Sequence, residues 1–493
     1  MPAGTDPASL LIRDIHTLVV MDEQNTVLHG AWVFVQNGVL QQIGAHSAKS
    51  PKAGRTIDGR HAVVIPGLIN THHHLYQTLT RAYAPAADAE LFDWLRTLYP
   101  IWARLDEEAV YAAALAGMAE LLLSGCTTTS DHHYVFPRGQ SRLIDAEIRA
   151  ARRIGIRFHP TRGSMSMGRS RGGLPPDSVV ESEDRILEDC ERVIAKYHDA
   201  SPGSMLRVGL APCSPFSVSR RLLRESAELA SRCGVRLHTH LAETRDEELF
   251  CLRRYGRRPL ELLAGAGWLH ANTWLAHGIY FDAREIPRLG RAGVGIAHCP
   301  TSNMRLGSGS APVPALRRAG CPVGLGVDGS ASNDSSHLLA EARQAILLQR
   351  LARGASALRV RDALRMATVE GARCLGRDDI GTLEAGKRAD LAMFDLRDVG
   401  YSGAGDAVSA LLLCAPTRVA ALIVEGRVVV EGGELRTLSL DRIVARHGRA
   451  SRRILSPGSA SIVFAPCTPV RTSSEGESAA VPKVPPGPFR RQG

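Results

Sequence analysis

The sequence lacks the features by which membrane and secreted proteins are usually recognised. None of its apolar runs reaches the roughly 18 residues needed to cross a bilayer. The amino-terminal stretch MPAGTDPASLLIRD does not combine a basic start with an apolar core, as a secretion signal does. We therefore expect a cytoplasmic protein with no membrane partner.

Paired cysteines and basic runs are also missing. The ten cysteines are scattered singly, with no CxxC pair, which argues against a thiolate zinc site and against a disulfide framework. The formal net charge is +10, but the basic residues are mostly arginines interleaved with acidic residues, and only 5% of the residues are aromatic. The sequence therefore predicts no nucleic-acid partner.

Between residues 63 and 375 the sequence alternates strand-length apolar runs with longer helical segments. The helical segments end at glycine, which is a usual stop signal. Eight such units in roughly 310 residues favour an α/β fold of the (β/α)8 TIM-barrel type, since an open doubly wound sheet needs fewer repeats. The predicted strands are AVVIPGLIN, GCTTTSD, GIRFHPT, LRVGLAP, VRLHTHLA, NTWLAHG, GVGIAHCP and CPVGLGVD.

The segments that flank this region have a different texture. Residues 1–62 and 378–446 consist of short alternating strands with turn signals, and together they can form one small β domain beside a barrel over residues 63–377. Residues 456–493 are rich in proline, serine and glycine, so we expect a disordered tail. The aromatic-rich connection after the first barrel strand is expected to form a lid over the barrel mouth.

Histidines gather at the predicted carboxyl ends of the barrel strands, where barrel enzymes have their active sites. Because side chains alternate along a strand, His72 and His74 point to the same side, whereas His73 faces away. His238 and His240 obey the same parity. We favour His240 as the residue that reaches the mouth, because it lies nearer the strand end.

Single histidines are more often ordinary hydrogen-bonding side chains than metal ligands, but a set of them at strand ends favours a metal site. Such a mixture of imidazoles with one carboxylate suits Zn²⁺ or Fe²⁺. Barrel hydrolases that hold two metal ions commonly bridge them with a modified lysine on a middle strand. The only lysine between Lys52 and Lys387 is Lys196, which lies in a polar helical segment, so we expect one divalent ion. The favoured set is His72, His74, His240, His277 and Asp328.

An ordered set of motifs resembles that of the amidohydrolase superfamily, in the branch that contains cytosine, guanine and S-adenosylhomocysteine deaminases and the triazine hydrolases. The resemblance runs from about residue 9 to 447. It implies a composite β-sandwich built from the two flanks, a metal-dependent barrel and a homo-oligomer. The motifs are PGLINTHHHL, HTHLAET, WLAHG, AHCPTSN, GLGVDGS and GTLEAGKRADLAMFDL.

The resemblance also assigns roles to individual residues. It implies that the metal, zinc or else iron, is held by His72, His74, His240 and Asp328. In this family pattern Asp328 takes a proton from the attacking water, Glu243 moves protons to the ring and to the leaving amine, and His277 orients the water and stabilises the oxyanion.

For the substrate, the resemblance implies a small heterocycle of purine type, with the conversion of 8-oxoguanine to urate and ammonia as the expected reaction. Gln77 matches a glutamine that reads the purine edge, although it can also be a surface residue of the lid. Arg162 can meet a ring oxygen or simply pair with an acid. Cys213 stands where guanine deaminases carry an arginine, and its small side chain would leave room for an 8-oxo group.

Three other functions stay open at this point. The same chemistry can act on an s-triazine of the hydroxyatrazine type, or on guanine or another nucleobase, because one barrel fold hosts many substrates. A non-catalytic scaffold of the same fold is the third. The full set of proposed ligands together with Glu243 and His277 disfavours the scaffold.

Overall fold

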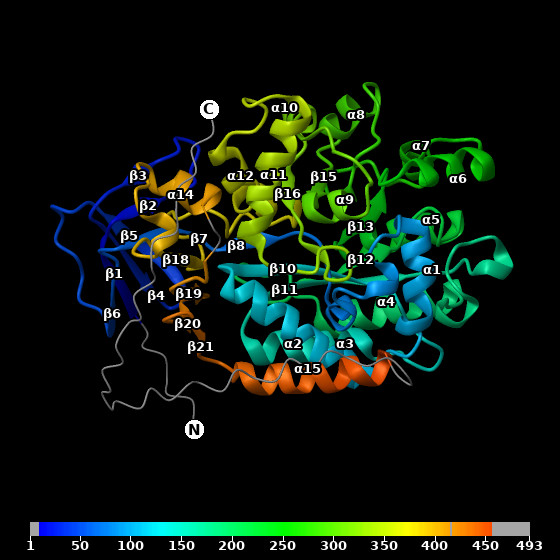
Figure 1. Ribbon diagram of the computed structural model, residues 1–493, viewed down its shortest axis with the longest axis horizontal. Coiled ribbons are helices and arrows are strands. Elements are labelled where there is room, and N and C mark those ends of the chain that lie inside the picture. The colour runs from blue at the N-terminus through cyan, green and yellow to red at the C-terminus, as the bar shows by residue number, and fades with distance from the viewer. Residues whose placement is uncertain (1–8, 415–416, 456–493) are drawn as a thin grey trace, which may run out of the picture. The chain divides into compact units, whose positions relative to one another are not determined.

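Eight parallel strands close into a barrel in the computed structural model (Figure 1), which describes residues 9–414 and 417–455. Around the barrel the strands follow the order β10, β11, β12, β13, β14, β15, β16, β8. This confirms the predicted TIM-barrel fold class. The barrel strands are β8 (Leu68–Asn70), β10 (Cys126–His133), β11 (Arg157–Ser164), β12 (Gly209–Pro212), β13 (Arg236–Leu241), β14 (Thr273–His277), β15 (Gly295–His298) and β16 (Val323–Leu325).

The first predicted strand, AVVIPGLIN, is divided between two sheets. Its first half, β7 (Ala62–Pro66), pairs with a strand from the other end of the chain, and only its second half, β8, enters the barrel. Gly67 lies at the division, where a Cβ atom would collide with the side chain of Thr127. Both halves are fully buried, so hydrophobicity alone does not show the division.

Helices alternate with the barrel strands, and several begin and end at the expected signals. The side chains of Asp106 and Ser219 cap α2 and α5, and Gly234 ends α5 with a φ of 65°. The helices are α1 (Leu91–Trp102), α2 (Glu107–Leu123), α3 (Leu143–Ile154), α4 (Glu183–Tyr197), α5 (Arg220–Cys233), α6 (Arg245–Tyr255), α7 (Pro259–Ala264), α8 (Glu285–Arg291), α9 (Pro300–Arg305), α10 (Val313–Arg318), α11 (Leu338–Arg353), α12 (Val360–Met366), α13 (Val369–Cys374), α14 (Ala407–Leu413) and α15 (Leu440–Leu455).

Two further sheets lie beside the barrel (Figure 1), one with the order β5-β4-β1-β6 and one with the order β21-β20-β19-β18-β7-β2-β3. The second sheet joins both ends of the chain, and residues such as Ile12, Val64 and Ile423 share one core. Their strands are β1 (Ser9–Ile15), β2 (Thr17–Val19), β3 (Val27–Leu28), β4 (Ala31–Gln36), β5 (Val39–Gly44), β6 (Arg55–Asp58), β7, β18 (Leu391–Asp395), β19 (Ala421–Val424), β20 (Arg427–Glu431) and β21 (Glu434–Leu435).

The domain limits at residues 62/63 and 377/378 stay a prediction, and the predicted tail at 456–493 lies outside the described residues. Within residues 9–414 and 417–455, no helix combines the length and the apolar character that a membrane span requires.

A buried ion pair joins the barrel to the larger of the two β sheets. Arg157 begins β11, and its guanidinium donates to both carboxylate oxygens of Asp390 at 3.0 and 3.1 Å. It also donates to Glu425 at 2.6 Å. Asp390 directly precedes β18 and Glu425 directly follows β19. The guanidinium of Arg157 therefore holds two strands of the sheet against the amino-terminal end of β11.

We predict that Arg157→Ala lowers the free energy of unfolding by about 3–5 kcal/mol, because it leaves the buried carboxylate of Asp390 without its partner. Urea denaturation of the purified variant measures this change. The control is Arg397→Ala, which removes a similar pair with Asp395 from the surface and should leave the unfolding midpoint almost unchanged. Equal, small effects of both changes would show that the buried pair does not hold the two parts together.

Candidate metal centre and substrate cavity

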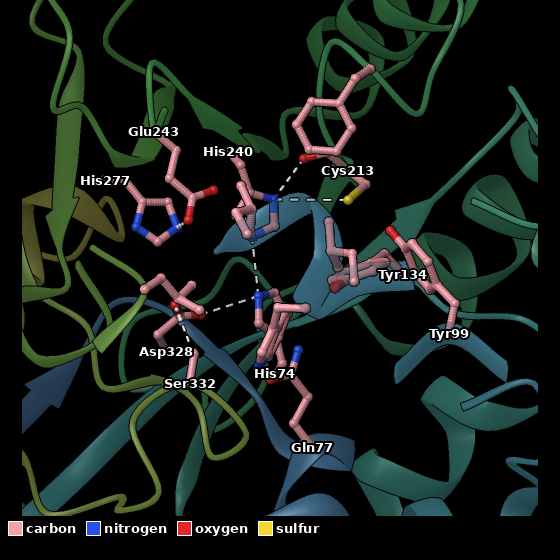
Figure 2. A pocket seen from close by; sticks show the side chains of 15 residues that line it. His74, Gln77, Tyr99, Tyr134, Cys213, His240, Glu243, His277, Asp328 and Ser332 are labelled. Carbon is pink, nitrogen blue, oxygen red and sulfur yellow. Dashed lines mark hydrogen bonds and ion pairs between the residues drawn. The ribbon is translucent and has the colours of Figure 1, made fainter. Parts of the chain in front are cut away.

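A cavity opens at the carboxyl ends of the barrel strands (Figure 2). One wall is polar and is formed at strand ends. The opposite wall is apolar and comes from α1, which confirms that the aromatic-rich connection covers the barrel mouth. The polar wall includes His74, His240, Glu243, His277 and Asp328, and the α1 wall includes Leu91, Trp94, Leu95 and Tyr99.

Three imidazoles and one carboxylate meet at the base of this cavity. One carboxylate oxygen of Asp328, Oδ1, lies 3.3 Å from Nε2 of His72 and 3.3 Å from Nε2 of His74. The Nε2 atoms of His74 and His240 are 3.1 Å apart. Two ligands of a tetrahedral zinc ion with bonds of 2.0–2.1 Å are about 3.3 Å apart. The four side chains therefore have the spacing of a coordination shell around one ion.

The hydrogen bonds of these rings show where their protons lie. Nδ1 of His74 is 2.7 Å from the carbonyl oxygen of His132, and Nδ1 of His240 is 2.7 Å from that of Cys213. A carbonyl only accepts, so each Nδ1 carries a proton, and in the neutral ring Nε2 keeps a lone pair. Lone pairs that face each other across 3.1 Å repel unless a cation lies between them.

Burial keeps this cluster in the protonation state that binds a metal. Desolvation lowers the pKa of His72 and of His240 well below the usual imidazole value, so both rings are neutral. Nε2 of His72 is buried without a hydrogen-bond partner among the described residues, as a vacant ligand atom would be.

Two of the site residues have a strained backbone. His277 and Asp328 have φ angles of 71° and 60°, in the left-handed region that non-glycine residues rarely adopt. Asp328 belongs to the short strand β17 (Asp328–Gly329), which pairs with β9 (His73–His74). Strain of this kind is held in place by the surrounding structure and clusters at functional sites.

Glu243 and His277 face each other beside the cluster. Oε1 of Glu243 lies 3.7 Å from Nε2 of His277. Burial, with a further contribution from Asp328, raises the pKa of Glu243 well above the usual carboxyl value. A neutral carboxyl group at this place can donate a proton to a bound molecule.

Three polar residues that sequence reasoning did not single out hold the site residues in place. Asn303 bonds Nδ1 of His277 at 3.0 Å. Ser302 donates to the second carboxylate oxygen of Asp328 at 2.5 Å, and Ser332 does so at 3.3 Å. All three lie within or next to the quoted motifs AHCPTSN and GLGVDGS, so their position in those motifs was the available signal.

Two of the three residues predicted to contact the substrate lie in the cavity lining. Gln77 and Cys213 line the cavity, and Oε1 of Gln77 is buried without a partner in the described part of the chain. Burial raises the pKa of Cys213 to about 12, which keeps its thiol neutral.

Arg162 is not among the described residues that line the cavity. Its guanidinium donates to Asp189 at 2.8 Å and to Glu181 at 3.0 Å, and it lies 3.7 Å from the centre of the Phe136 ring. Of the two interpretations open from the sequence, the structure favours pairing with acids.

The remaining histidines lie around the cluster rather than in it. His73 bonds Ser336 at 3.0 Å, as expected of a residue that faces away from its neighbours. His133 bonds Glu147 at 2.8 Å. His132 and His238 lie inside the barrel, where Nε2 of His238 is 2.7 Å from Nδ1 of His72.

The sequence matches a known family over most of its length. A profile of the amidohydrolase family matches residues 63–429, so this chain belongs to the amidohydrolase family. The predicted family is thereby confirmed, and the chain is a hydrolase of that family with a site that fits a divalent metal ion.

The chain is similar to individual enzymes of this family over most of its length. The chain is 51% identical over 427 residues to the 8-oxoguanine deaminase of Pseudomonas aeruginosa, and this alignment covers 87% of this chain and 95% of that protein. It is 37% identical over 465 residues to the hydroxydechloroatrazine ethylaminohydrolase of Pseudomonas sp. strain ADP, covering 90% and 95%. The crystal structure of an atrazine chlorohydrolase from Arthrobacter aurescens complexed with zinc superposes with a TM-score of 0.87 at 36% identity, covering 90% and 100%.

Proposed function

We propose that this chain is a metal-dependent aminohydrolase that converts 8-oxoguanine to urate and ammonia. The observation that carries the proposal is the 51% identity to an 8-oxoguanine deaminase across nearly the whole of both chains. A cavity with one polar and one apolar wall, as expected for a small heterocycle, agrees with it.

The proposed ligands of a single divalent ion, zinc or else iron, are His72, His74, His240 and Asp328. Their mutual spacing and the direction of their lone pairs support the assignment. When bound, such an ion lowers the pKa of water towards ~7 and so provides a nucleophile at neutral pH.

The other side chains then move the protons. Glu243 begins protonated because burial raises its pKa, so it can protonate a ring nitrogen and make the neighbouring carbon electrophilic. Asp328 accepts the proton of the attacking water while Ser302 and Ser332 hold its second oxygen. His277, fixed by Asn303, orients the water through Nε2, takes up its second proton and then donates to the developing oxyanion. That proton passes by way of Glu243, which lies 3.7 Å from His277, to the leaving amine, which departs as ammonia, and the proton on Asp328 restores Glu243.

We assign recognition of the substrate to two uncharged residues of the cavity lining, Gln77 and Cys213. The unpartnered Oε1 of Gln77 can accept a hydrogen bond from a ring N–H, and its amide nitrogen can donate to a ring oxygen. Cys213 is small and neutral, and therefore leaves space next to His240 for an additional oxygen on the five-membered ring.

The discriminating experiment is ammonia release by the purified enzyme from 8-oxoguanine, guanine, isoxanthopterin, cytosine and an aminotriazine. We expect the highest kcat/KM on 8-oxoguanine. Hydrolysis of an s-triazine is the second candidate function, since the chain also resembles a triazine aminohydrolase at 37% identity. A higher kcat/KM on the triazine or on guanine would reject the proposed substrate, and a metal-free protein inactive on all of them would point to a scaffold.

We predict that Cys213→Arg lowers kcat/KM on 8-oxoguanine by about 10- to 200-fold, as changes in pocket volume commonly do. The larger side chain fills the space proposed for the 8-oxo group, so kcat/KM on guanine should fall less or rise. Cys213→Ser is the matched control, because it keeps the size and the backbone carbonyl that holds His240. A parallel fall on both purines in Cys213→Arg would contradict the role given to this position.

A further inference from the structure

Two buried imidazoles inside the barrel have no role in the proposed function. His132 and His238 lie beneath the ligand cluster, with their ring centres 5.2 Å apart, and both are fully buried. The centre of the His238 ring is also 4.9 Å from that of His72. Imidazoles placed this close to a ligand need a physical reason, because burying them costs hydration.

The hydrogen bonds of His238 run in one direction. Its Nδ1 is 2.9 Å from the carbonyl oxygen of Trp274, which can only accept, so Nδ1 carries the proton. A neutral ring has one proton, and Nε2 is therefore an acceptor. Nδ1 of His72 lies 2.7 Å from this Nε2 and must donate to it. The remaining nitrogen of His72, Nε2, is left with a lone pair directed at the ligand cluster.

Trp274 holds His72 from two sides. Its carbonyl ends the relay that begins at the His72 ring, and its indole N–H donates to the carbonyl of Thr71, the residue before His72, at 3.0 Å. The indole also stacks on the His238 ring, with centres 4.3 Å apart and planes inclined by 14°. Trp274 therefore holds the backbone next to His72 directly, and it holds the side chain of His72 through the stacked ring of His238.

We propose that His238 is a positioning residue that sets the tautomer and the ring orientation of His72 through this relay to Trp274. The inference rests on the proposed metal ligands. Residues that accept the second N–H of a ligating histidine typically change metal affinity by 10- to 100-fold. Here the acceptor is itself a histidine, and its tautomer is fixed in turn by a backbone carbonyl.

A second metal ion shared by His72, His132 and His238 is the alternative, because ligand atoms of these three rings also lie within 4.8 Å of one another. The distances decide against it. Nδ1 of His72 and Nε2 of His238 are 2.7 Å apart, well below the about 3.3 Å that separates two ligands of one tetrahedral zinc ion. The corresponding distances in the proposed site are 3.1–3.3 Å. The close pair is therefore a hydrogen bond.

The test compares His238→Phe with His238→Gln in the full-length protein. Phenylalanine keeps a flat ring against Trp274 but accepts nothing, whereas the glutamine carbonyl can accept from His72. We expect the dissociation constant for zinc, measured by chelator competition, to rise 10- to 100-fold in the Phe variant and to return most of the way in the Gln variant. The absorption bands of the Co²⁺-loaded Phe variant should shift, because the orientation of one ligand changes.

Unchanged affinity and spectrum in His238→Phe, or equal losses in both variants, would overturn the proposal. So would two metal ions per wild-type chain, which would support the shared site. Histidine-labelled wild-type protein gives an answer even if the variants do not fold: ¹⁵N NMR should show the proton of His238 on Nδ1, and a proton on Nε2 would refute the relay. His72→Ala distinguishes a failure of the positioning role of His238 from a failure of the proposed ligand set, because full metal content in that variant would reject the ligand set itself.

Discussion

Glu243→Gln should lower kcat by about 10²- to 10⁴-fold while the protein keeps its metal, since that is the usual contribution of a positioned general acid. The amide has nearly the shape of the carboxyl group but cannot release a proton to the ring. Glu243 lines the cavity, and its Oε1 lies 3.7 Å from Nε2 of His277. Steady-state ammonia release, with metal content measured on the same sample, tests this directly.

The pH dependence of Glu243 gives a second readout. The protonated form starts the reaction, so activity should fall as the pH rises through the pKa of Glu243, which burial raises well above the usual carboxyl value. The residual activity of Glu243→Gln should lack this alkaline limb. Asp246→Asn is the matched control, because it makes the same chemical change on an exposed residue of α6. Near-normal turnover of a metal-loaded Glu243→Gln enzyme would remove Glu243 from the mechanism.

His72→Ala should remove the metal and reduce kcat/KM by about 10³-fold or more, because the charge stabilisation that a catalytic metal supplies amounts to several kcal/mol. The variant should still fold, since the barrel is held by packing far beyond this one ring. Metal analysis after dialysis, circular dichroism and ammonia release report on the three expectations separately.

The neighbouring histidine provides the control for this experiment. His73 is equally buried and lies one residue along the chain, but it faces Ser336 rather than the cluster. His73→Ala should therefore keep its metal. Full metal occupancy in His72→Ala, or equal metal loss in both variants, would show that alternation along the first strand does not select the ligands.

Strand alternation and strand ends were enough to indicate which histidines gather at the site. The period of two placed His72 and His74 on one side, and the position of His240 nearer to its strand end favoured it over His238. The structure brings all three together with Asp328. The eight apolar runs also sufficed for the barrel, because each of them overlaps one barrel strand, although β10 and β11 extend beyond the ends of their runs at Asp131 and Thr161.

The features that sequence reasoning missed depend on contacts between distant segments. The division of AVVIPGLIN between two sheets follows from the partners of each half, and both halves are equally apolar. The sequence left two roles open for Arg162, and choosing between them required the positions of Asp189 and Glu181 in the fold. The left-handed backbone of His277 and Asp328 leaves no mark in composition or periodicity.

The most direct test of this account is a crystal structure of the zinc-loaded enzyme measured at the zinc absorption edge. We predict one anomalous peak per chain, about 2.0–2.2 Å from Nε2 of His72, His74 and His240 and from a carboxylate oxygen of Asp328. A peak elsewhere in the barrel, or one that any of these four side chains fails to contact, would contradict the proposed centre and the chemistry built on it.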